Sequence, residues 1–101
     1  MRAIKTDPRI RKAQIFRDAM LLAERIGHKR LTRDSVATEA RVSGPLVAKY
    51  FRNMNRLREA VLREAIKREN LSILSHCVAD EALLSHPTLR RNTLEYISAK
   101  L

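Results

Sequence analysis

The amino-acid sequence predicts an all-α protein, on three observations. Apolar residues recur at three- and four-residue spacing, and no segment sustains the two-residue alternation of a strand. The chain has 2 Gly and 3 Pro among 101 residues, fewer than a β-rich fold with many tight turns would need. Each apolar run also begins near a Ser, Thr, Asp or Asn that suits a helix N-cap. The length allows one domain with a modest core.

The first helix is expected to follow Asp7-Pro8. An acceptor side chain at the N-cap and a proline at the first helical position both favour a helix start. Gly27 can adopt the left-handed conformation that ends the helix. The apolar face between these two ends consists of Ile15, Phe16, Ala19, Leu22, Ala23 and Ile26.

Two short helices are expected next, at about 33–40 and 44–51, with Thr32 and Ser43 as their N-caps. They are joined by Arg41-Val42-Ser43, so the pair has helix-turn-helix proportions. Small apolar side chains on the two helices and the turn can close a shared core: Val36, Ala37, Ala40, Val42 and Val47.

Three further helices are expected in the second half of the chain. Asn53 caps a longer helix that continues through Ile66, and the apolar residues after Asn70 predict another helix that ends at Ser85-His86-Pro87. Thr88 is expected to cap the last one. The predicted organisation is one compact domain, with a helix-turn-helix unit and basic N-terminal arm over 1–53 and a helical core and dimerisation region over 54–101.

The charge is large and uneven. The net charge is +10 at pH 7; residues 1–52 carry 13 basic and 5 acidic side chains, residues 53–101 carry 8 and 6, and none of residues 70–89 is Lys or Arg. Such a charge indicates a polyanionic partner, with nucleic acid first and an anionic membrane surface second. The basic arm contains Arg2, Lys5, Arg9, Arg11 and Lys12, which either reach DNA or form a solvated terminus.

The location expected for the chain is cytoplasmic. The single cysteine, Cys77, forms no intramolecular disulfide, and the basic start is not followed by the apolar core of a signal peptide. No uncharged stretch is long enough to span a bilayer. Of the two polyanionic partners, DNA is expected and a membrane is not.

The stretch 19–61 resembles the N-terminal DNA-binding region of the tetracycline-repressor (TetR) family of transcriptional regulators. The resemblance covers 43 of 101 residues and depends on an ordered series of positions: Gly27, Leu31-Thr32, Val36-Ala37, Ala40, Val42-Ser43, Tyr50-Phe51, Leu57 and Ala60-Val61. The family often has glycine at the positions of Arg41 and Pro45, and an arginine there predicts a differently shaped turn. The family also normally continues for a further hundred or more residues, so this chain resembles a reduced repressor without a sizeable effector pocket.

This resemblance, with the local charge, implies a set of DNA-contacting residues. Lys49 is expected to contact a base edge and Leu46 a thymine methyl group, while Tyr50 matches a family tyrosine whose hydroxyl reaches a phosphate. The alternatives are a solvated lysine, a leucine packed inside and a tyrosine ring that only packs. Thr32 and Ser43 could cap helices and contact phosphates as well. The full set is Lys29, Arg30, Thr32, Arg33, Ser43, Gly44, Pro45, Leu46, Lys49, Tyr50 and Arg52.

The implied function is a sequence-specific repressor that binds double-stranded DNA at a palindromic operator as a homodimer, because one unit offers few contacts. The segment 70–89 is the expected dimer interface; its alternative role is to close the monomer's own core. The interface residues are Leu71, Leu74, Val78, Leu83 and Leu84.

Enzymes and metalloproteins are not expected. His76, Cys77 and His86 match none of the usual zinc spacings, no cofactor motif occurs, and no Gly-rich phosphate loop or nucleophile arrangement is present. Two other functions stay open: a nucleoid-type or RNA-binding protein that uses charge without reading sequence, and a helix-turn-helix scaffold used as a protein–protein adaptor.

Overall fold

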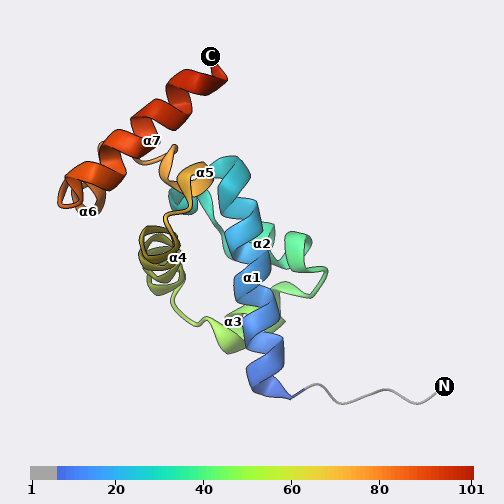
Figure 1. Cartoon of the computed structure of the whole chain (residues 1–101). Helices are drawn as coiled ribbons and strands as arrows, with labels where there is room; N and C mark the ends of the chain where they lie inside the picture. The colour runs from blue at the N-terminus through green and yellow to red at the C-terminus, as the bar shows by residue number, and fades with distance from the viewer. Residues whose placement is uncertain (1–6) are drawn as a thin grey trace.

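The computed structural model describes residues 7–101, and no strand occurs among them. The prediction of an all-α protein is confirmed (Figure 1). The elements in order are α1 (Pro8–Ile26), a 3₁₀ turn η1 (His28–Arg30), α2 (Arg33–Ala40), α3 (Gly44–Tyr50), α4 (Met54–Arg68), α5 (Leu71–Leu74), α6 (Glu81–Leu84) and α7 (Pro87–Lys100).

The first four α-helices begin where their capping residues predict. The Asp7 side chain accepts a hydrogen bond from Arg9 N at 2.8 Å, and the Ser43 hydroxyl accepts from Leu46 N at 3.2 Å. Thr32 forms a capping box with Ser35, and Asn53 caps α4. Each cap satisfies amide donors that the first turn of a helix leaves unpaired.

The turn between α2 and α3 is where one prediction is wrong. Arg41 was expected to reshape this turn, yet it adopts the left-handed conformation itself, with φ of 58° and ψ of 44°. Val42 N then donates to Ala37 O at 3.0 Å, as in the usual left-handed helix end. The local hydrogen bonds thus hold an arginine in a conformation that costs roughly 1–2 kcal/mol in a residue with a Cβ.

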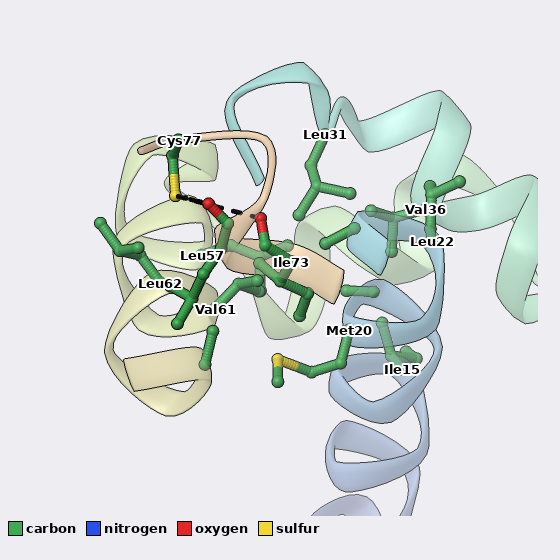
Figure 2. Packing of buried hydrophobic residues seen from close by; sticks show 14 of the residues in the cluster. Ile15, Met20, Leu22, Leu31, Val36, Leu57, Val61, Leu62, Ile73 and Cys77 are labelled. Carbon is green, nitrogen blue, oxygen red and sulfur yellow. Dashed lines mark hydrogen bonds between the residues drawn. The ribbon is translucent and has the colours of Figure 1, made fainter. Parts of the chain in front are cut away.

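One hydrophobic core joins the two predicted segments. Fully buried side chains come from α1, the η1–α2 connection, α2, α3 and α4, and the core continues into α5, α6 and α7. Figure 2 shows Ile15 and Met20 of α1 on one side of Ile73, with Leu57 and Val61 of α4 on the other. The helix-turn-helix unit is therefore packed onto the rest of the chain through α1 and α4.

The prediction of a single helix through 71–84 is wrong. Two four-residue helices, α5 and α6, are separated by a turn whose amides bond three residues back, including His76 N to Ile73 O and Asp80 N to Cys77 O. The Asp80 carboxylate accepts from Ala82 N at 3.0 Å and so starts α6. Polar side chains compete here with the helical hydrogen bonds.

The last helix begins two residues earlier than predicted. His86 stands at the N-cap and Pro87 at the first position, so Thr88 lies inside the helix rather than capping it. Helix α7 packs on α5 and α6 through Leu89 and Thr93 and extends away from the helix-turn-helix end (Figure 1). The described chain is elongated, measuring 51 × 24 × 20 Å.

Candidate nucleic-acid interface

Helix α3 has one buried face and one open face. Val47 is fully buried, and Phe51 after the helix packs against the Phe16 ring at 6.5 Å between centroids. Lys49 is exposed and Leu46 is half-buried outside the core cluster. The inner position of Val47 and Phe51 is therefore as expected, and Lys49 and Leu46, three residues apart, share the outer face.

The first turn of α3 lies beside the first turn of α2. A Cβ built on Gly44 would stand 3.4 Å from Arg33 Nε, so this arginine side chain lies directly over the start of α3. Arg33 also approaches the Asp34 carboxylate, at 3.7 Å, and more than half of its side chain stays exposed. Pro45 leaves one fewer amide donor at this helix start. The structure thus brings Arg33, Ser43, Gly44 and Pro45 together.

Thr32 and Arg30 lie at the start of α2. The Thr32 hydroxyl accepts from Ser35 N at 3.0 Å, and the Ser35 hydroxyl accepts from Thr32 N at 2.9 Å. Both Thr32 and Arg30 are exposed. Capping by Thr32 is confirmed; a phosphate contact by either residue stays a prediction.

Lys29 forms an ion pair away from the start of α3. Its ammonium lies 3.3 Å from the Asp80 carboxylate, at the start of α6. The Asp80 pKa is lowered, first by the hydrogen bond from Ala82 N and then by Lys29. Lys29 therefore links η1 to the C-terminal region instead of lying beside α3.

Two aromatic rings at the end of α3 each lie beneath a cation. The Lys49 ammonium lies 5.6 Å from the centre of the half-buried Tyr50 ring, and the Lys12 ammonium lies 5.4 Å from the centre of Phe51. Arg52 is exposed in the connection to α4. An aromatic ring attracts a cation without neutralising its charge, so both lysines can still attract an anion.

Two contacts that position the helix-turn-helix unit were not predicted. The Arg25 guanidinium on α1 forms a two-pronged hydrogen bond with the Glu39 carboxylate on α2, and this contact lowers the Glu39 pKa. Arg58 Nε on α4 donates to Leu31 O at 2.8 Å, before α2. Both contacts join residues at least 14 apart, so no helical spacing could have indicated them.

The basic arm is only partly within the described residues. Arg2 and Lys5 lie outside them. Arg9, Arg11 and Lys12 belong to the first turns of α1 rather than to an arm. Lys12 lies against the end of α3, over Phe51.

The residues predicted for the dimer interface fall into three groups. Leu74 and Leu83 are fully buried in the chain's own core and offer no surface to a partner. Leu71 and Val78 pack partly against that core. Leu84 is 49% exposed, so it is the member of the set best placed for a partner.

His76 and Cys77 both contact backbone carbonyl oxygens. His76 Nε2 lies 3.1 Å from Glu24 O, and the buried Cys77 thiol donates to Leu74 O (Figure 2). Burial raises the Cys77 pKa to about 11, so the thiol is neutral at pH 7. Among residues 7–101, no three His, Cys, Asp or Glu side chains gather as metal ligands.

The chain matches no protein-family model, no curated protein and no solved structure. In the described part of the chain, none of the helices combines the length and the apolar character needed to cross a membrane.

Proposed function

We propose that this protein is a sequence-specific DNA-binding transcriptional regulator, a cytoplasmic repressor that binds a palindromic operator as a homodimer. The observation that carries the proposal is the two-faced α3. Val47 anchors its inner side to the core, while Lys49 and Leu46 occupy the outer side of a helix-turn-helix pair. A helix presented in this way fits the DNA major groove, where side chains can reach base edges.

The surrounding charge supports the same proposal. Within the described residues, Arg30, Lys49 and Arg52 form no ion pair with a carboxylate. Cations left in this state can replace the counterions of DNA phosphates. Thr32 and Ser43 add exposed hydroxyls at two helix starts, and Tyr50 adds a phenol beside Lys49.

The proposed division of roles follows from the positions. Lys49 donates to guanine O6 and N7, and Leu46 covers a thymine methyl group, so the two together read a short half-site. Arg30, Arg33 and Arg52 bind phosphates and set the orientation of the unit. Two copies place two α3 helices about 34 Å apart, one turn of DNA, which accounts for a palindromic site.

The test is selection of binding sites from a pool of random DNA duplexes, followed by titration of the selected duplex and a scrambled one. We expect a palindromic selected sequence that binds at least about 1,000-fold more tightly than the scrambled duplex. Equal affinity for both duplexes would instead support a nucleoid-type protein. Absence of binding to either at moderate salt would support the adaptor.

A further inference from the structure

A groove of about 780 Å³ lies between the first turns of α1, the end of α3 and α4. Its volume is within the range of small-molecule sites, roughly 300–1,000 Å³. The three elements that frame it can be followed in Figure 1. Among the lining residues no carboxylate occurs, and six are cations: Arg9, Lys12, Lys49, Arg52, Arg56 and Arg63.

The charge of the groove is largely uncompensated. Arg9 is paired with Asp7, but the other five lining cations form no ion pair with a carboxylate in residues 7–101. Like charges gathered in one groove repel each other, so a bound anion would relieve that repulsion. This groove therefore favours an anionic group.

The groove also has an apolar and aromatic lining, formed by Ala13, Phe16, Phe51, Leu57 and Ala60. Phe16 and Phe51 lie against each other, with an angle of 31° between the rings. A simple inorganic anion would leave this lining in water, and a purely apolar molecule would leave the cations without a partner. Only a ligand with both parts uses the whole groove.

We infer that the groove binds a small amphipathic anion, with a phosphate, sulfate or carboxylate head and an aromatic or apolar body. The head lies among Lys12, Arg56 and Arg63, and the body lies on the half-buried rings of Phe16 and Phe51.

The groove shares Lys49, Tyr50 and Arg52 with the proposed DNA-binding surface. An anion bound there brings negative charge beside Lys49 and Arg52, and this charge offsets their attraction for DNA phosphates. Its binding should therefore weaken DNA binding. This consequence, unlike the site itself, rests on the proposed function.

The probe is 1-naphthyl phosphate, measured by titration calorimetry against inorganic phosphate and 1-naphthol, which supply the head and the body separately. We expect 1-naphthyl phosphate to bind at least about tenfold more tightly than either one. The groove variant is Arg56→Ser with Arg63→Ser, and the control is Arg17→Ser with Arg91→Ser, since all four side chains are exposed. The groove variant should bind the probe about tenfold more weakly and the control should bind as the unchanged protein does.

Three outcomes would overturn the site: inorganic phosphate binding as tightly as the probe, 1-naphthol binding as tightly, or equal losses in the two variants. These titrations contain no DNA, so their result is independent of whether the protein binds DNA. With the selected duplex added, saturating probe should lower DNA affinity several-fold in the unchanged protein and not in the groove variant. Unchanged DNA affinity would overturn the proposed competition.

Discussion

The pair α2–α3 and the pair α5–α6 are both built from short capped helices, but their polar groups point to different partners. Around α5–α6, the polar groups bond to α1. Ser72 Oγ donates to Glu24 O at 3.2 Å, His76 Nε2 lies 3.1 Å from the same oxygen, and Asn70 donates to the Glu24 carboxylate at 3.0 Å. In α2–α3, apolar Val47 anchors the inner side, and Lys49 of α3 and the following Arg52 stay exposed.

The two pairs differ in how much of their polar surface is used to stabilise the fold. Short helices are marginal by themselves and need tertiary packing. In the α5–α6 pair, most leucines and the polar side chains take part in that packing. Leu84 is the leucine of this pair that stays exposed to a partner. The α2–α3 pair is held by apolar side chains and by contacts from Arg25 and Arg58, so its outer polar groups remain available to a ligand.

The largest expected effect breaks the packing of α5. Leu74→Ala removes a fully buried side chain and should lower the free energy of unfolding by about 2–5 kcal/mol. The matched substitution Leu84→Ala, at a half-exposed leucine of α6, should cost less than about 1 kcal/mol. Urea unfolding of both variants measures the difference.

Leu84 also tests the proposed dimer. Leu84→Glu should lower the dimer mass in sedimentation without unfolding the chain, because this side chain is exposed in the monomer. A small stability loss for Leu74→Ala would contradict its place in the core, and an unchanged dimer for Leu84→Glu would remove Leu84 from the interface.

The next effect concerns the outer face of α3. Lys49→Ala should weaken binding to the selected duplex by about 1–3 kcal/mol and binding to scrambled DNA far less, because a base contact is lost. The control Lys67→Ala removes an exposed lysine about 20 Å further along α4 from its first turn and should change neither affinity. Equal losses on both duplexes would make Lys49 a phosphate contact and leave the reading of bases to other residues.

Leu46→Ala belongs to the same experiment. If Leu46 covers a thymine methyl group, its loss should matter at one base pair only, where thymine is replaced by uracil or cytosine. A titration of duplexes substituted base by base checks this. Sensitivity at the same base pair as Lys49→Ala would show that the two side chains do not read separate positions.

Local chemistry made much of the fold predictable. Asp7, Thr32, Ser43 and Asn53 mark four helix starts because capping depends only on neighbouring amides. The break at 75–80 was missed because the apolar spacing there also fits a longer helix. It depends on Asp80 and on the contact of His76 with Glu24, 52 residues away.

The candidate site was predictable only in part. The outer and inner faces of α3 follow from spacing alone, so Val47 and Lys49 fell on the expected sides. The contact of Lys29 with Asp80 and the groove that brings Lys12 and Arg63 together depend on tertiary packing between distant segments. Spacing within one helix contains no information about either.

A smaller effect on stability is expected at the two residues with left-handed backbone conformation. Arg41 ends α2 with φ of 58°, and Glu69 ends α4 with φ of 53°. Replacing either with glycine removes the steric cost of the Cβ, roughly 1–2 kcal/mol, and loses roughly 0.5–1 kcal/mol to the freer unfolded chain. The free energy of unfolding of each variant, measured in urea, should therefore rise by up to about 1.5 kcal/mol.

The two glycine variants should differ in DNA binding. Arg41→Gly also removes an exposed cation from the helix-turn-helix turn. If Arg41 contacts a phosphate, the slope of log binding constant against log salt concentration should become shallower by about one. Glu69→Gly should leave the salt dependence unchanged. A loss of stability in either variant would show that the side chain contributes more than its backbone strain costs.

The smallest effect is a pH dependence at the junction of the two regions. His28 in η1 is buried, and its Nδ1 has no hydrogen-bond partner within the described residues. Burial lowers the His28 pKa below its usual 6.5, and the attraction of Asp80 offsets part of that shift. The unfolded chain therefore binds more protons than the folded chain at acid pH. Stability from neutral His28 is fully present above pH 6.5 and is lost as the pH falls through the folded-state pKa.

The melting temperature should accordingly fall between pH 7.5 and pH 5.5, and His28→Gln should reduce that fall. His86→Gln is the control, because it removes a histidine whose side chain is exposed. An equal fall in the unchanged protein and in His28→Gln would show that the titrating group lies elsewhere. A reduced fall only in His28→Gln would instead show that protonation of the buried His28 ring destabilises the fold.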